Sequence, residues 1–223
     1  MPSVSVEHYL KAIYGLGGES QPVSLTDLSK ELSISLPSVS EMVKKLAKRG
    51  LVIHKPYTGV SLTQAGRDHA TTVTRRHRLW ERFLTDILGI PWDKVLEEAC
   101  RLEHATSPLE EERLAELLGW PESCPHGHPI PTPKGEVPHE EGRPLSELQR
   151  GQKAVVLRVP VNSPFPLWAL ALGLVPQAEI EVEAIAPFEG PLTVRVAQTQ
   201  HVLGRKVASQ IVVRAPGMRR RQQ

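Results

Sequence analysis

Apolar residues in the first half of the chain recur at the three- and four-residue spacing of amphipathic helices. This pattern predicts a first helix over residues 6–16, followed by shorter helices over residues 26–32 and 37–49. Ser24 and Asp27 stand at the spacing of a capping box at the start of the second helix.

Short runs of β-branched residues, 51–54 and 60–63, flank a polar tip directly after the third helix and predict a β-hairpin. A helix-turn-helix followed by a hairpin is the pattern of a winged helix. A long helix is expected over residues 64–88, with Thr63 as its N-cap, and a further helix over residues 92–105.

The second half of the chain has a different pattern. Seven prolines lie between residues 121 and 144, which predicts an extended tether that cannot continue a helix. Beyond it, β-branched runs separated by Gly, Pro and Asn predict a small all-β barrel, with strands over residues 155–159, 180–186, 193–196 and 211–213.

The expected fold is therefore mainly α in its N-terminal part, with a small C-terminal all-β barrel. The expected domains are a winged helix-turn-helix (1–63), a helical domain (64–120), a proline-rich linker (121–144) and the barrel (145–216).

Composition and charge narrow the class of protein. Hydrophobic residues make up 40% of the 223, enough for a packed core, which excludes a disordered chain. Residues 1–82 carry 12 Lys and Arg against 7 Asp and Glu, whereas residues 83–150 carry 6 against 14. A basic N-terminal part indicates a module that binds a polyanion. The chain shows neither a membrane-spanning run nor a signal-peptide pattern, and two cysteines make no disulfide scaffold, so we expect a cytoplasmic location.

The residues around the predicted third helix favour DNA as the polyanion. Small hydroxyl side chains near its N-terminus let the backbone approach the groove floor, and the lysines further along can reach phosphates. The predicted DNA contacts are Thr26, Ser35, Pro37, Ser38, Ser40, Glu41, Lys44, Lys45 and Lys55. An ordinary helical hairpin with a charged, solvated face is the alternative.

Potential metal ligands lie on the two later helices. His77 and Glu81 fall one turn apart within an apolar arc, where a carboxylate must be paired or bound to a cation. Cys100, Glu103 and His104 share one face of the next helix, because residues at i, i+3 and i+4 are neighbours. Packing alone hardly explains three different ligand types on one helix face, so this face indicates a metal site.

The order of these motifs resembles the metal-dependent repressors of the diphtheria-toxin-repressor type. The residues that carry the resemblance are His8 on the first helix, the winged helix, the stretch 77–82 and the stretch 98–104. The resemblance continues through Cys124-Pro125-His126-Gly127-His128-Pro129 and into a C-terminal domain like the SH3-like module of iron-transport accessory proteins. It implies that residues 64–120 form a dimerisation and metal-binding domain.

By this resemblance His8, Cys100, Glu103 and His104 form the primary metal site. Taken alone, the position of His8 on the first helix favours a solvated surface histidine. His77 and Glu81 match the ancillary site, whose third ligand is a histidine where this chain has Leu96.

Two further ancillary ligands, a Glu and a Gln in relatives, correspond to Asn162 and Phe165. This chain departs from the family pattern there and at Leu96. Glu97, or shared use of Glu103, is an alternative way to complete the ancillary site.

Cys124, His126 and His128 suggest zinc, but a proline-rich tether implies no fixed geometry, so we expect no site there.

The sequence thus predicts a homodimeric repressor of metal-uptake genes that binds palindromic double-stranded DNA when activated by Mn(II) or Fe(II). Thiolate and imidazole favour softer metals and carboxylates favour Mn(II), so the ligands leave the choice open. The alternatives are a winged-helix regulator that responds to a small organic ligand and, less favoured, a hydrolase that uses Cys100 and His104. We expect no enzyme, because no oxyanion-hole loop or metalloprotease motif is visible.

Overall fold

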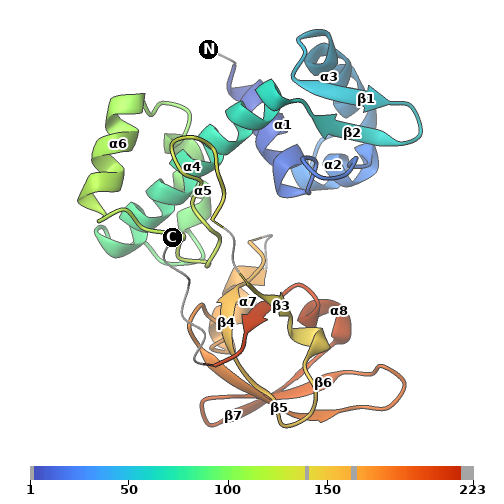
Figure 1. Cartoon of the computed structure of the whole chain (residues 1–223), viewed down its shortest axis with the longest axis vertical. Helices are drawn as coiled ribbons and strands as arrows, with labels where there is room; N and C mark the ends of the chain where they lie inside the picture. The colour runs from blue at the N-terminus through green and yellow to red at the C-terminus, as the bar shows by residue number, and fades with distance from the viewer. Residues whose placement is uncertain (1–2, 139–140, 162–164, 217–223) are drawn as a thin grey trace. The chain divides into compact units, whose positions relative to one another are not determined.

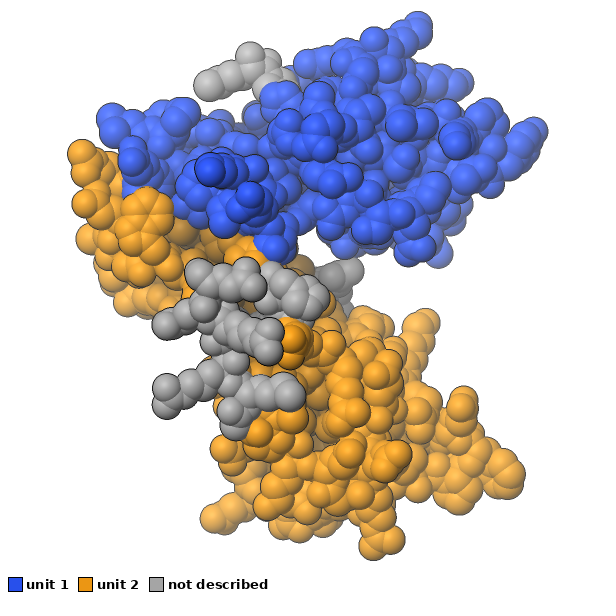
Figure 2. Space-filling model, in the orientation of Figure 1, with its two compact units in different colours: residues 1–77, 100–112, 131–137 blue, residues 78–99, 113–130, 138–223 orange. Residues whose placement is uncertain are grey.

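The computed structural model describes residues 3–138, 141–161 and 165–216. They form two compact units, drawn in separate colours in Figure 2. Unit 1 contains residues from the ranges 1–77, 100–112 and 131–137, and unit 2 contains residues from the ranges 78–99, 113–130 and 138–223.

Unit 1 begins with a winged helix, as predicted (Figure 1). Its elements are α1 (Val4–Gly15), α2 (Leu25–Leu32), α3 (Leu36–Lys48), β1 (Val52–Lys55) and β2 (Gly59–Leu62). The strands pair antiparallel, and Val23 forms a bridge to the second of them. The core between these elements is continuous and includes Leu10, Ile13, Leu28, Val39, Val43, Leu46, Val52 and Val60.

Side-chain caps fix where these helices begin. Ser24 Oγ accepts a hydrogen bond from the Asp27 backbone N–H at 3.0 Å, which confirms the predicted cap of α2. Thr63 Oγ1 accepts one from the Gly66 N–H at 3.1 Å, at the start of α4 (Gln64–Asp86).

The later helices differ in detail from the sequence pattern. Helix α5 (Val95–Leu102) is shorter than expected, and α6 (Pro108–Leu117) was not predicted individually. Arg75 of α4 is buried in unit 1, where it donates to Glu111 Oε1 at 2.8 Å and to the Pro131 carbonyl at 2.7 Å. The carboxylate and the carbonyl accept hydrogen bonds from the buried guanidinium, which makes its burial tolerable. The pattern of apolar residues along the helix could not indicate these partners.

Unit 2 contains an antiparallel six-stranded sheet in the order β3-β8-β4-β5-β6-β7, which confirms the expected SH3-like architecture. The strands are β3 (Arg143–Pro144), β4 (Lys153–Arg158), β5 (Glu179–Ile185), β6 (Leu192–Val196), β7 (Thr199–Leu203) and β8 (Val212–Arg214). Short helices η1 (Leu145–Glu147), α7 (Phe165–Ala171) and α8 (Arg205–Ala208) complete it. Register shifts in β4 and β5 mark bulges, which bend a sheet. Strand β7 was missed because its alternation is weak.

The first part of the proline-rich segment, 121–130, is not an extended tether, so that expectation is wrong. Cys124 and His126 are buried. The Cys124 N–H donates to the His128 carbonyl at 2.9 Å, and the Gly127 N–H donates to the Cys124 carbonyl, also at 2.9 Å. The Val159 N–H donates to the His126 carbonyl at 3.2 Å. These bonds close the segment into a turn that packs on the end of β4.

Among the described residues, no helix combines the length and the apolar character needed to span a membrane.

Gly127 is the residue that this turn requires, and Gly127→Ala should lower the free energy of unfolding by about 2 kcal/mol or more. Its φ is +87°, and an added Cβ would lie 1.9 Å from the Leu157 carbonyl oxygen. Gly89→Ala is the matched control, since φ is +65° there and an added Cβ meets nothing within 4 Å. Equal losses in denaturant titrations of the two variants would contradict the close contact.

Candidate metal centres and DNA-binding surface

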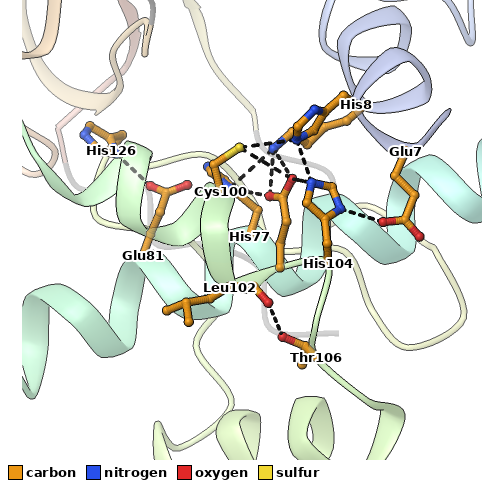
Figure 3. Close-up of polar contacts among 11 residues, drawn as sticks. Glu7, His8, His77, Glu81, Cys100, Leu102, His104, Thr106 and His126 are labelled. Carbon is orange, nitrogen blue, oxygen red and sulfur yellow. Dashed lines mark hydrogen bonds and ion pairs between the residues drawn. The ribbon is translucent and has the colours of Figure 1, made fainter. Parts of the chain in front are cut away.

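Four of the predicted ligands meet in unit 1: His8 of α1, Cys100 of α5, and Glu103 and His104 just beyond α5. Figure 3 labels His8, Cys100 and His104 of this group. Their ligand atoms lie within 4.8 Å of one another. His8 Nε2 lies 2.6 Å from His104 Nε2 and 3.5 Å from Cys100 Sγ. A thiol, a carboxylate and two imidazoles in this arrangement suit a divalent transition metal. We call these four residues the first cluster.

A second layer of side chains orients the first cluster. His104 Nδ1 lies 2.5 Å from Glu7 Oε2, so a proton on Nδ1 points at the carboxylate and leaves the Nε2 lone pair facing the cluster. Burial lowers the pKa of His8, and the neighbouring His104 and Lys11 lower it further. A neutral His8 imidazole can therefore offer a lone pair to a metal.

Glu103 is the most buried member of the cluster and is fully inaccessible to solvent. His77 Nδ1 lies 2.5 Å from its Oε2. Lys11 Nζ donates to both carboxylate oxygens, at 2.6 and 2.7 Å. Burial raises the pKa of Glu103, but the hydrogen bonds and charges of His77 and Lys11 outweigh it, so the net pKa is lowered.

Sequence reasoning missed Lys11 and Glu7. Both lie on the helix that carries His8: Glu7 is one residue before it, and Lys11 is one turn after it. A lysine one turn from a potential ligand is usually read as solvated, and only the burial of Glu103 gives it a partner.

A second cluster lies in unit 2 and consists of Glu81 on α4 with Cys124 and His126 in the closed turn. All three residues are buried, and their ligand atoms also lie within 4.8 Å of one another. His126 Nδ1 lies 2.8 Å from Glu81 Oε2, a contact drawn in Figure 3. The His126 ring stacks on Trp92, with centroids 4.4 Å apart.

The second cluster also fits a metal. His126 Nε2 is buried without a hydrogen-bond partner among the described residues. Burial, followed by the Glu81 carboxylate, raises the pKa of the Cys124 thiol well above its usual range. A cation held by these three residues would neutralise Glu81 and displace the thiol proton. The expectation that the Cys124 and His126 side chains have no fixed geometry is therefore wrong.

The predicted DNA-contacting side chains lie on α2, α3 and the hairpin. All are exposed except Ser40, which is partly buried. Ser35 Oγ lies 2.9 Å from Ser38 Oγ at the start of α3. Lys45 Nζ forms an ion pair with Glu41 at 2.7 Å on the exposed surface of α3.

Family models match three successive parts of the chain. A family model for the N-terminal DNA binding domain of iron dependent repressors matches residues 1–60. The model for their metal binding and dimerisation domain matches residues 63–132, and a FeoA domain model matches residues 143–215.

Individual relatives agree with these models. The iron-dependent repressor IdeR of Mycobacterium bovis is 39% identical over 127 residues, which are 57% of this chain and 55% of that protein. The diphtheria toxin repressor of Corynebacterium jeikeium is 37% identical over 151 residues, 68% of this chain and 62% of that protein. The matches thus span a little over half the length of these relatives.

A solved manganese-dependent transcriptional repressor in complex with manganese is 34% identical, with a TM-score of 0.85 over 94% of this chain and 99% of that chain. This chain belongs to the diphtheria-toxin-repressor family.

In this member of the diphtheria-toxin-repressor family, the residues expected to form the ancillary metal site have other partners than the resemblance implies. His77 contacts Glu103, consistent with the alternative in which Glu103 is shared, and Glu81 contacts His126. Phe165 packs against the core of the sheet domain, and its ring lies 5.1 Å from that of Trp168. Asn162 lies outside the described residues.

Two isosteric substitutions test the two clusters. Glu81→Gln and Glu103→Gln should each lower the bound metal from about two equivalents per chain to about one, because each removes a buried anionic donor from one cluster. Equilibrium dialysis with metal analysis measures the stoichiometry. A Glu81→Gln chain that keeps the wild-type stoichiometry would remove the second cluster as a metal site.

Proposed function

We propose that the chain is a DNA-binding transcriptional repressor activated by Mn(II) or Fe(II), acting as a homodimer on a palindromic operator. The observation that carries this proposal is the first cluster, which joins α1 of the winged helix to the end of α5. Two relatives of the chain support the choice of metals, since one is named an iron-dependent repressor and the other a manganese-dependent transcriptional repressor. The repression of metal-uptake genes follows from the family and is part of the proposal.

A divalent cation at the first cluster supplies positive charge and accepts lone pairs from sulfur, nitrogen and oxygen. The residues of the chain do the rest. His8 extends from α1, whose apolar residues Val6, Leu10 and Ile13 belong to the winged-helix core. Fixing His8 against Cys100 and His104 therefore fixes the helix on which the DNA-reading elements pack. In a dimer this sets the separation of two recognition helices.

The metal acts on DNA affinity only through its preference for the DNA-competent arrangement. His104 is engaged at both nitrogens, by Glu7 and by His8, so it is not reserved as a base for Cys100. This arrangement favours ligation over nucleophilic catalysis, and we propose no enzymatic activity.

His8→Ala tests the link between metal and DNA. The variant should still bind Mn(II) through the other three ligands, more weakly, but metal should no longer raise its affinity for operator DNA. Calorimetry measures the first effect and fluorescence anisotropy the second. His69→Ala, an exposed histidine in α4, is the control and should respond as wild type. Normal metal-dependent DNA binding by His8→Ala would refute the proposal that metal raises DNA affinity by fixing α1 through His8.

Lys44→Ala tests the DNA surface. It should weaken binding to operator and to unrelated DNA alike and reduce the slope of log K against log salt by about 1, because one phosphate contact is lost. Lys45→Ala should have a smaller effect, since Glu41 already partly neutralises that ammonium. Lys153→Ala, on β4, serves as the control. An unchanged salt slope for Lys44→Ala would exclude it from the contact set.

A further inference from the structure

The ammonium group of Lys11 lies where it competes with a metal for Glu103. It donates to both carboxylate oxygens, at 2.6 and 2.7 Å, and lies 3.4 Å from His77 Nδ1. The Glu103 side chain is fully buried, and that of Lys11 is 24% exposed. A buried carboxylate needs a cation close by, and in this arrangement the chain provides its own.

The remaining contacts of Glu103 leave little room for a second cation. His77 occupies Oε2 at 2.5 Å, and His104 Nε2 lies 3.1 Å from Oε1. If Glu103 is to serve as a ligand beside Cys100 and His104, at least one of its oxygens must exchange the ammonium for the metal. Two cations on one carboxylate also repel each other, more strongly in a buried site than in water.

We propose that Lys11 is a built-in competitor cation that occupies Glu103 in the metal-free protein and is displaced when metal binds. This inference rests on the proposed function. In it, Lys11 sets the metal concentration at which the first cluster responds. Lys11 is suited to the role, since its long flexible stem lets the ammonium move from Glu103 to solvent.

The exchange also changes how α1 is held. In the structure, α1 is tied to the α5 side of unit 1 through the Lys11–Glu103 ion pair, through the Glu7–His104 contact and through His8, whose Nε2 lies 2.6 Å from His104 Nε2. When metal displaces Lys11, the first of these ties is lost, and the other two, one helical turn earlier, remain. The two states then differ in whether the turn of α1 that carries Lys11 is anchored, and not in whether the helix is attached.

The test is Mn(II) affinity measured by calorimetry on the full chain. Lys11→Met removes the charge and keeps the length of the side chain, so it should bind Mn(II) about tenfold more tightly or better than wild type. Lys11→Arg keeps the charge and should bind no more tightly than wild type. Lys30→Met, which removes an exposed ammonium on α2, is the control and should leave the affinity unchanged. Equal or weaker binding by Lys11→Met overturns the proposal.

A second measurement needs no variant. Acylation of wild-type lysines by an amine-reactive ester, mapped by mass spectrometry, should be faster at Lys11 when Mn(II) is present, relative to Lys30. An unchanged or slower rate at Lys11 overturns the displacement.

The two hypotheses fail in different ways. If wild type binds Mn(II) and Lys11→Met binds no more tightly, the competitor role fails and the proposed function stands. If neither protein binds metal at the first cluster, both fail.

Discussion

The buried carboxylate of Glu103 is the group on which the rest of unit 1 depends. A charge that is fully removed from water is tolerated only beside opposite charge and hydrogen-bond donors. Lys11 comes from α1, His77 from α4 and His104 from the end of α5, and all three converge on Glu103. The carboxylate of Glu103 thus contacts side chains from α1, α4 and the end of α5. A change of the cation beside it therefore affects the contacts of all three helices.

If Lys11 is displaced as proposed, regulation is an exchange between cations and not an assembly from loose parts. In the structure, the winged helix has its own core, its caps and its contacts to the end of α5. A metal can then shift the population of DNA-competent arrangements only by the difference between its affinity for that arrangement and for the others. Under the proposed competition, the internal ammonium lowers the net affinity for metal, so the cation must be abundant enough to overcome it.

Local sequence patterns predicted what is set locally. The spacing of Cys100, Glu103 and His104 predicted that their side chains would meet, although the helix ends at Leu102. The caps at Ser24 and Thr63 follow from residue type. Contacts between distant parts of the chain were not predictable in the same way. Glu81 and His126 are 45 residues apart, and Lys11 and Glu103 are 92 apart. The proline count of the segment after α6 correctly excluded a helix but gave no sign that residues 121–130 close into a turn.

That turn links the second cluster to the sheet domain within unit 2. The His126 carbonyl accepts a hydrogen bond from the Val159 N–H just beyond β4. The His126 ring stacks on Trp92, which packs against the core of the sheet. Among the described residues, His126 Nε2 has no hydrogen-bond partner, and a buried polar atom without one costs about 1–3 kcal/mol. A cation bound by Glu81, Cys124 and His126 would need all three side chains close together, and the closed turn is what brings Cys124 and His126 to Glu81. By linkage, metal would then stabilise the packing of the turn on β4 as well as the cluster itself.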